Sequence, residues 1–296
     1  MKLIIHLGVH KTASTFLQKE LFPNIESYTF IERNKLQNFK EYILYCDDLE
    51  FESTYSYDLF CKSIDEPLSS RVLISDEDFY GMPFYGAIDR KRNIDRLTST
   101  FATVDLSFII VLRQQESLLN SLYLQYVKTG GTANSNEFIV SKQYPLLITN
   151  SYFKYDRYLK FIEDKIGNDN LCCLFYEDFI KDKEGFILNL ETFMGFKSTL
   201  VNEENQIKNS SISAFTCKII LFLNKLTKTY KNPHGFLPFI FSKFYIKIAL
   251  KFSAKFKKTK KIIFFTASNL NEILNSNSAL RKYKNENWLQ TNKYLK

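Results

Sequence analysis

The sequence predicts a three-layer α/β domain with a mostly parallel central sheet. Short apolar runs, each long enough for a buried strand, alternate along the chain with stretches of helical periodicity. The main candidate strands are residues 3–5, 71–75, 106–112 and 171–175. The third run is apolar almost throughout, which is typical of a central parallel strand. We expect this domain to occupy residues 1–204, with a basic helical extension at 205–296 packed on it.

The loop after the first strand is the stretch around which the domain is organised. Gly8 begins a short turn, and the helical pattern starts at Phe16. The first N–H groups of a helix have no partner inside it and can bind a phosphate-like group, to which hydroxyl and ammonium groups add donors. The residues expected to hold such a group are Lys11, Thr12, Ala13, Ser14 and Thr15.

The spacing in this loop excludes the signature of P-loop nucleoside triphosphatases, G-x-x-x-x-G-K-[ST]. His10 precedes Lys11, and Gly8 lies only three positions before that lysine. The loop instead resembles the 5′-phosphosulfate loop of sulfotransferases, in which a strand is followed by Lys-Ser/Thr-Gly-Ser/Thr-Thr and an aromatic residue. Ala13 stands where glycine is usual, so the loop needs a conformation that tolerates a methyl group. The alternative is an ordinary polar helix N-terminus.

Further elements are predicted between the loop and the second main strand. They are a helix at 15–21, a short strand at 27–31 and a helix at 35–49, while residues 50–68 have no clear pattern.

Three acidic residues, Asp76, Glu77 and Asp78, follow the strand at 71–75. The carboxyl ends of parallel strands are where α/β folds bind their ligands. These acids could hold Mg²⁺ for phosphoryl transfer, one could be a general base, or they could cap the next element. Some carbohydrate sulfotransferases use a glutamate after their second core strand as the base. The resemblance therefore implies this role for Glu77, with His10 as the rival base.

A second match to sulfotransferases follows the strand at 106–112. Arg113 ends that strand, and Ser121 lies eight residues later on a helix predicted at 116–127. Eight residues are a little over two turns, so the two side chains share a face if the helix begins promptly. In sulfotransferases an arginine and a serine at this spacing bind the donor's 3′-phosphate. The resemblance implies the same role for Arg113 and Ser121, and a phosphoadenosine donor.

A third match follows the strand at 171–175, where Tyr176 begins the sequence Tyr-Glu-Asp before a helix. In several sulfotransferases this tyrosine contacts the adenine, and an aromatic face suits base stacking. The alternative role for Tyr176 is a core tyrosine. Asn209, Ser210 and Ser211 could add donors to the phosphate site. The resemblance covers roughly residues 1–195, and helices are predicted at 87–101, 152–166 and 179–193.

The positive charge is concentrated in one segment. The chain carries a net charge of +8, while residues 206–271 contain thirteen lysines and no Asp or Glu, so the rest of the chain is net acidic. A basic amphipathic pattern at 239–261 fits peripheral contact with an anionic membrane surface, or a helix that covers the core with solvated lysines. The charge could also attract an acidic glycan. No nucleic-acid motif accompanies it, so nucleic acid is not an expected partner.

Cysteine and histidine usage excludes two further classes. Five scattered cysteines give no disulfide framework, and three histidines with no C-x-x-C give no zinc signature, so no metal site is expected. No signal peptide and no apolar stretch of about 18 residues is found. We expect a cytoplasmic protein, and the alternative is a protein attached peripherally to the cytoplasmic face of the membrane.

Taken together, the motifs resemble those of a bacterial carbohydrate-type sulfotransferase. The resemblance implies transfer of a sulfuryl group from 3′-phosphoadenosine 5′-phosphosulfate to an acceptor hydroxyl on a carbohydrate or glycolipid, without a metal. Lys11 would be a catalytic residue beside Glu77 or His10. Two alternatives remain: a P-loop-type kinase using ATP and Mg²⁺, and a non-enzymatic membrane-associated binding protein with a degenerate nucleotide site.

Overall fold

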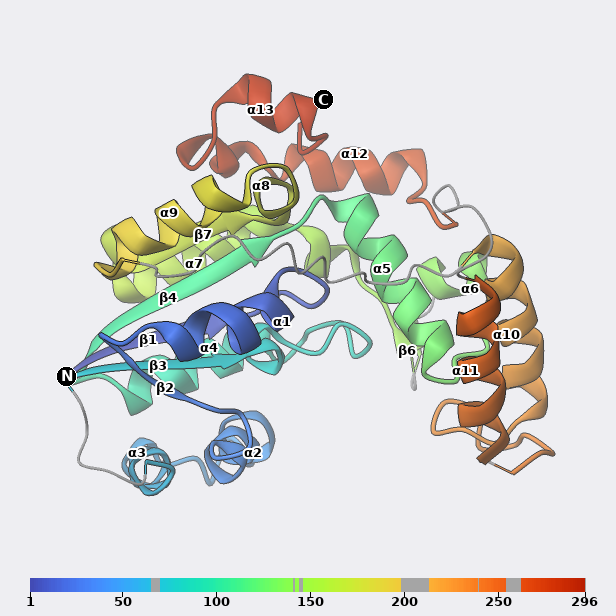
Figure 1. The fold of residues 1–296 in the computed structure, drawn as a ribbon, viewed down its shortest axis with the longest axis horizontal. Coiled ribbons are helices and arrows are strands. Elements are labelled where there is room, and N and C mark those ends of the chain that lie inside the picture. The colour runs from blue at the N-terminus through green and yellow to red at the C-terminus, as the bar shows by residue number, and fades with distance from the viewer. Residues whose placement is uncertain are drawn as a thin grey trace.

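The computed structural model describes residues 1–64, 70–140, 142–143, 146–197, 213–238, 240–253 and 262–295 (Figure 1). Its central sheet has five strands in the order β2-β3-β1-β4-β7, and every neighbouring pair is parallel. The strands are β1 (Lys2–Leu7), β2 (Thr29–Ile31), β3 (Arg71–Asp76), β4 (Asp105–Leu112) and β7 (Leu171–Phe175). The predicted α/β class and all predicted strands are confirmed. A separate antiparallel pair joins β5 (Lys142–Gln143) to β6 (Leu146–Leu147).

The sheet is covered on both faces, which makes the three predicted layers. Successive residues of a strand point to opposite faces. Leu3 and Ile5 of β1 accordingly belong to one hydrophobic cluster and Ile4 to the other. Because both faces are buried, the strands are apolar throughout instead of alternating with polar residues.

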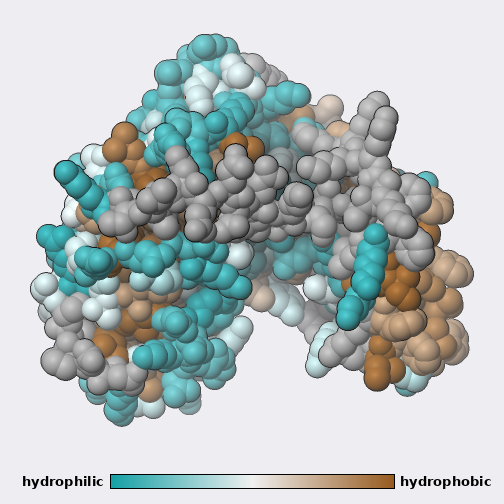
Figure 2. Space-filling model, in the orientation of Figure 1, coloured by the Kyte–Doolittle hydropathy of each residue, from teal (hydrophilic) through white to brown (hydrophobic). Residues whose placement is uncertain are grey.

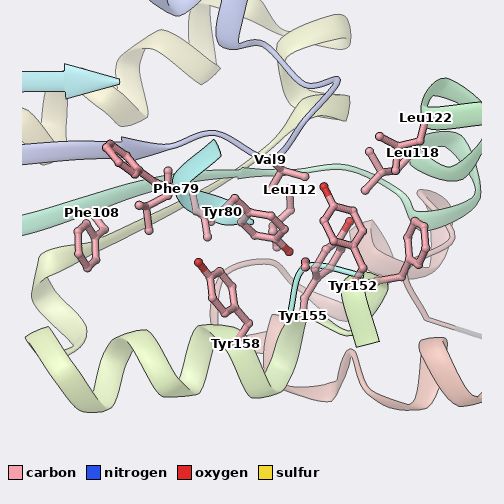
Figure 3. Close-up of a cluster of buried hydrophobic side chains, with 14 of the residues drawn as sticks. Val9, Phe79, Tyr80, Phe108, Leu112, Leu118, Leu122, Tyr152, Tyr155 and Tyr158 are labelled. Atoms are coloured by element: carbon pink, nitrogen blue, oxygen red, sulfur yellow. The ribbon is translucent and has the colours of Figure 1, made fainter. Parts of the chain in front are cut away.

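The larger hydrophobic cluster lies between the sheet and four helices: α2 (Gln37–Tyr45), α3 (Ser53–Lys62), α4 (Arg90–Thr100) and α7 (Tyr155–Ile166). Figure 3 shows its part below the carboxyl edge, where Tyr80, Tyr152 and Tyr158 pack around one another. Tyr80 ends the 3-10 turn η3 (Glu77–Tyr80), and η4 (Asn150–Phe153) contains Tyr152. This aromatic packing fixes η3, which carries the acidic run, against the core.

The smaller cluster lies on the other face and is covered by the helical turns after the first loop and by one later helix. These elements are α1 (Ser14–Phe16), the π-helical turn η1 (Leu17–Leu21), the 3-10 turn η2 (Phe22–Asn24) and α9 (Lys183–Met194). The helix predicted at 15–21 is therefore a mixture of helix types. The helix predicted at 179–193 is divided into α8 (Tyr176–Lys181) and α9, because the Asp182 carboxylate caps α9 by accepting from Gly185 N at 2.9 Å.

Helix α5 (Gln115–Lys128) begins at the carboxyl edge of the sheet and leads away from it toward α6 (Ser135–Val140) (Figure 1). The Gln114 side chain caps its first turn by accepting a hydrogen bond from Ser117 N at 2.8 Å. The helix therefore begins promptly after β4, as the Arg113–Ser121 spacing argument required.

The C-terminal part packs on the domain. It contains α10 (Ala214–Leu226), α11 (Ile240–Ser253), α12 (Ala267–Asn275), the 3-10 turn η6 (Ser278–Lys282) and α13 (Glu286–Thr291). Lys282 of η6 donates to Asn168 in the 3-10 turn η5 (Asn168–Asn170) of the preceding domain. Ile220, Phe265, Leu280 and Tyr294 are members of the larger hydrophobic cluster. The predicted boundary at 204–205 lies outside the described residues and stays a prediction. None of the helices that the structure describes is long and apolar enough to cross a membrane.

Candidate functional site

The loop predicted to bind a phosphate-like group connects β1 to α1 at the carboxyl edge of the sheet. Its one positive φ falls on Lys11, at 66°. Ala13 has φ −88° and ψ 8°, a conformation open to any L-residue. The methyl group at this position therefore causes no backbone strain, which is how the loop accommodates the departure from glycine.

The N–H groups at the start of this helix are available to a ligand. The first backbone hydrogen bond of the helix runs from Leu17 N to Ala13 O at 3.0 Å, so the preceding N–H groups lie before the helical ladder. The Thr12 hydroxyl donates to Val9 O at 2.8 Å and fixes the turn. Ser14 is buried, and its hydroxyl oxygen lies 3.5 Å from the Thr12 hydroxyl oxygen. Thr15 is exposed at the helix start.

Gly8 has a packing role that the motif alone did not reveal. A Cβ atom at Gly8 would lie 2.8 Å from Glu77 Cγ and 3.0 Å from Ser14 Oγ. Glycine at position 8 leaves room for the Glu77 side chain to pack against the loop. The strand-end glutamate and the loop after β1 are thereby brought into close contact.

The other two acids of the 76–78 run are neutralised by cations that the sequence did not single out. Asp76 is buried and accepts hydrogen bonds from Arg33 Nε at 2.9 Å and Arg33 Nη2 at 3.0 Å. The Lys40 ammonium lies 3.1 Å from Asp76 and 2.5 Å from Asp78. Burial acts to raise the pKa of Asp78, but hydrogen bonds from His10 and Lys40 outweigh it and hold this pKa well below its usual range.

This network weighs against the kinase alternative. Arg33 and Lys40 already neutralise Asp76 and Asp78, which leaves Glu77 as the carboxylate of this run that could approach Mg²⁺. Asp76 also caps η3 by accepting from Asp78 N at 2.9 Å, which confirms the capping interpretation for this residue.

Glu77 and His10, the two rival bases, differ in their surroundings. No cation of the described chain lies within ion-pair distance of Glu77, and its charge raises the pKa of Lys11. The His10 Nε2 atom lies 3.4 Å from Asp78 Oδ1, while its Nδ1 atom is buried and has no hydrogen-bond partner among the described residues. His10 is only 8% exposed. Glu77 is therefore the better placed of the two to meet an acceptor.

Arg113 joins the three sequence motifs. One guanidinium nitrogen donates to Lys11 O at 2.5 Å, and Nε donates to the Ser117 hydroxyl at 3.0 Å. The guanidinium carbon lies 4.5 Å from the centre of the Tyr176 ring, within cation–π distance. Tyr155 donates its phenolic proton to Arg113 O at 2.5 Å, which connects the site to the aromatic core of Figure 3.

Ser121 lies one turn after Ser117 on α5, so the two hydroxyls share a helix face. In this structure Arg113 contacts Ser117, a residue that the motif comparison missed although it stands four residues after the arginine. Ser121 is half-buried. Ser117 thus stands between Arg113 and Ser121, the two residues predicted to act together. The other predicted donors, Asn209, Ser210 and Ser211, lie outside the described residues.

Aromatic side chains lie beside the loop. Tyr176 is half-buried, 6.1 Å from Phe179 between ring centres, and Phe179 is 5.0 Å from Phe16. Lys183 lies 4.4 Å from the centre of the Phe16 ring. Tyr176 is thus a rim residue that Arg113 stacks on, not a fully buried core tyrosine.

Like charges are crowded at this edge. Desolvation lowers the pKa of Lys11, and Arg113 lowers it further against the opposing effect of Glu77. Desolvation also lowers the pKa of Arg113. Lys128, at the end of α5, likewise has its pKa lowered by desolvation and then by Lys11. Sequence reasoning missed Lys128 because no motif marks it. Lys11 thus interacts unfavourably with the positive charge of both Arg113 and Lys128, an arrangement suited to binding an anion.

Comparison with solved structures identifies the fold. A sulfotransferase from Alicyclobacillus acidocaldarius matches with a TM-score of 0.51 and 15% identity over 70% of this chain and 85% of that one. The mouse sulfotransferase SULT7A1 complexed with PAP matches with a TM-score of 0.42 and 13% identity, over 99% of this chain and 87% of that one. No family model matches the sequence, and no curated protein is significantly similar to it. The chain has the α/β fold of sulfotransferases, at low sequence identity.

Proposed function

We propose that this chain is a sulfotransferase that transfers a sulfuryl group from 3′-phosphoadenosine 5′-phosphosulfate to an acceptor hydroxyl. The observation that carries the proposal is that Arg113 links the phosphate loop to α5 and to Tyr176: it donates to Lys11 O and to the Ser117 hydroxyl, and it lies over the Tyr176 ring. The donor carries a 5′-phosphosulfate and a 3′-phosphate, and its negative charges would offset the unfavourable interaction between the Lys11 and Arg113 cations. The shared fold supports the assignment without establishing the activity.

The residues present fit such a donor. The loop N–H groups of residues 12–15 and the Lys11 ammonium would bind the 5′-phosphosulfate, as a helix start binds phosphate. Arg113, with the hydroxyls of Ser117 and Ser121, would bind the 3′-phosphate. Tyr176 would stack on the adenine, with the Arg113 guanidinium on its ring. Gly8 keeps the loop open to Glu77.

The proposed transfer is a single in-line displacement. The acceptor oxygen forms a bond to sulfur while the bond between sulfur and the 5′-phosphate oxygen breaks. Glu77 takes the acceptor proton, because it is the carboxylate of the 76–78 run that no described cation neutralises. Lys11 and the loop N–H groups stabilise the negative charge that develops on the departing phosphate oxygen.

We assign a carbohydrate or glycolipid hydroxyl as the acceptor, because the proposed base is a glutamate at the end of the second core strand. An alcohol of this kind needs a base in the transition state, and Glu77 supplies it next to the loop.

Isothermal titration with 3′,5′-adenosine bisphosphate, against ATP with Mg²⁺ as comparison, tests the donor class. We expect micromolar or tighter binding of the bisphosphate, weaker binding of ATP, and a loss of about tenfold or more in Arg113→Ala, because a charge-assisted fork is removed. Arg157→Ala is the control, since Arg157 is an exposed arginine on α7.

The outcomes separate the three candidate functions. Preferential binding of ATP with Mg²⁺ would favour the kinase. Binding of neither nucleotide would leave the non-enzymatic alternative. If the bisphosphate binds, the donor is next incubated with a pool of glycans or glycolipids, and the released bisphosphate is measured. Loss of this release in Glu77→Gln, at unchanged donor affinity, would establish both the activity and the base.

A further inference from the structure

Helices α10 and α11 form a hairpin at one end of the molecule (Figure 1). We call residues 214–238 and 240–253 the α10–α11 hairpin. One side of it packs on α5: the Asn224 amide donates to Val127 O at 2.8 Å and to Gly131 O at 2.7 Å. Tyr245 of α11 donates to Asn224 Oδ1 at 2.6 Å. The hairpin is therefore fixed to the domain through polar contacts made by its inner side.

The outer side of the hairpin is apolar and exposed. On α10, Ile219 and Phe222 are exposed, the latter by 63%, and they lie three residues apart on one face. On α11, Phe241 and Phe244 are likewise three apart, with 66% exposure at Phe244. Phe236 in the connecting loop is 87% exposed. Figure 2 shows the resulting hydrophobic surface on the side of the molecule formed by α10 and α11.

This concentration is not typical of the rest of the surface. Ten of the nineteen exposed large hydrophobic side chains in the described part of the chain belong to the α10–α11 hairpin. The others, such as Leu49, Ile88 and Leu188, are scattered over other elements. Scattered exposed hydrophobic residues are normal, whereas a contiguous apolar face marks a contact surface.

The charge on this face specifies the kind of partner. Exposed lysines stand among the apolar residues: Lys218 and Lys225 on α10, and Lys247 and Lys251 on α11. Residues 206–271 contain no Asp or Glu, so no acidic side chain of the hairpin balances them. Apolar side chains that can enter the acyl boundary, with lysines that remain at the headgroup level, are the composition of an interfacial membrane-binding element.

The same charge argues against a second copy of the chain as the occupant of this face. A two-fold symmetric contact would pair the patch with itself and would bring lysines against lysines. An anionic bilayer, in contrast, offers both the apolar phase and the opposite charge over the whole face. We propose that the outer face of the α10–α11 hairpin docks on an anionic lipid membrane, with Phe222 and Phe244 inserted and the flanking lysines at the phosphate level.

The loop of the α10–α11 hairpin contacts the segment that follows η3. Lys231, in the hairpin loop, lies 4.8 Å from the centre of the Phe84 ring and 5.2 Å from that of Tyr126. Phe84 belongs to the segment that follows η3, the element that carries Glu77. Thr229 donates to Gly130 O at 3.0 Å. The hairpin loop is thus joined to the segment that continues from the Glu77 turn and to the end of α5.

Vesicle flotation with the full chain tests the proposal, using phosphatidylcholine vesicles with and without 30% phosphatidylglycerol, about one lipid in three. We expect binding to the anionic vesicles only. Phe222→Ser with Phe244→Ser should weaken it by about tenfold or more, since two inserted aromatic side chains are lost. Lys225→Gln with Lys251→Gln should weaken it by about tenfold at low salt. Leu188→Ser and the pair Lys19→Gln with Lys160→Gln are the matched controls.

A fluorescence measurement separates insertion from surface adsorption. Brominated lipids should quench the added fluorescence of Phe222→Trp and should not quench that of Leu188→Trp. Absence of binding to anionic vesicles, an equal loss in the control variants, or binding that survives loss of both phenylalanines would overturn the proposal. So would a dimer seen by light scattering that dissociates in the double phenylalanine variant. None of these readouts uses sulfuryl transfer, so the membrane proposal can fail while the proposed function stands.

Discussion

Two groups of charges lie at the same edge of the sheet and are arranged in opposite ways. At the end of β3, Asp76 and Asp78 are paired with Arg33 and Lys40. At the loop after β1, cations crowd one another, and Glu77 is the carboxylate that opposes them. The first group satisfies itself and holds the fold together. In the proposed function the second group is completed by the anionic donor, and this difference would distinguish a binding site from a structural ion network.

Removing Lys11 tests the incomplete group and should have the largest effect. In Lys11→Ala we expect kcat/KM for sulfuryl transfer to fall by about 10²–10³, the usual cost of losing one preorganised donor to a developing oxyanion. The free energy of unfolding should be unchanged or slightly higher, because a crowded cation is removed. Steady-state kinetics and thermal unfolding measure the two effects. Lys19→Ala, an exposed lysine on η1, is the control, and full activity in Lys11→Ala would refute the mechanism.

Breaking the satisfied group should give the opposite result. Asp76→Asn leaves Arg33 and Lys40 without their buried partner, which should lower the free energy of unfolding by about 3 kcal/mol. Bisphosphate affinity in the folded variant should change little. Glu77→Gln is the matched comparison, and it should keep stability while it loses transfer. If Asp76→Asn abolished bisphosphate binding at full stability, the distinction between the two groups would be wrong.

His6 differs from both groups of charges, because it is a buried titratable side chain that stays neutral. Its Nδ1 lies 2.7 Å from Ser75 Oγ, and burial lowers the pKa of His6 to about 3. Between this value and the ordinary value of about 6.5 the unfolded chain binds the extra proton, so stability falls as the pH falls.

The difference in unfolding free energy between the natural chain and His6→Gln should therefore change by about 1.4 kcal/mol per pH unit below pH of about 6.5. Urea denaturation at several pH values measures it. Above pH 7 the difference should be constant, and a pH-independent difference throughout would mean that His6 is not the titrating group.

The smallest expected effect is at Lys128, the outer member of the crowded cations. Lys128→Met should reduce affinity for the bisphosphate by about fivefold, roughly 1 kcal/mol of electrostatic attraction, and should make binding less dependent on salt. Lys160→Met, on the distant surface of α7, should leave both unchanged. An unchanged salt dependence in Lys128→Met would place this lysine outside the anion site.

The sequence predicted most of the fold because its strands are buried on both faces and therefore stand out as apolar runs. It missed α3, whose Ser-Thr-Tyr-Ser start and mixed polarity hide a face that contributes mainly Phe60 to the core. It also missed the break between α8 and α9, which depends on the cap at Asp182.

At the site, motif spacing located Lys11, Arg113 and Tyr176, which the structure brings together. Spacing could not show that Asp76 and Asp78 are neutralised by Arg33 and Lys40. Arg33 lies just after β2 and Lys40 lies on α2, and both are far from the two acids in the sequence. Nor could it show which residue takes the strained backbone conformation, since that depends on how the whole turn closes over β1.

Helix α5 has a consequence for the size of the acceptor. It begins two residues after Arg113, where the donor's 3′-phosphate would bind, and ends at the residues that hold the α10–α11 hairpin. Its fourteen residues make it about 21 Å long. If the hairpin rests on a bilayer, this helix fixes the position of the donor relative to the lipid surface. A hydroxyl at the depth of the acyl chains could not reach the sulfur, so the acceptor group must project outward from its lipid, as an extended glycan headgroup does.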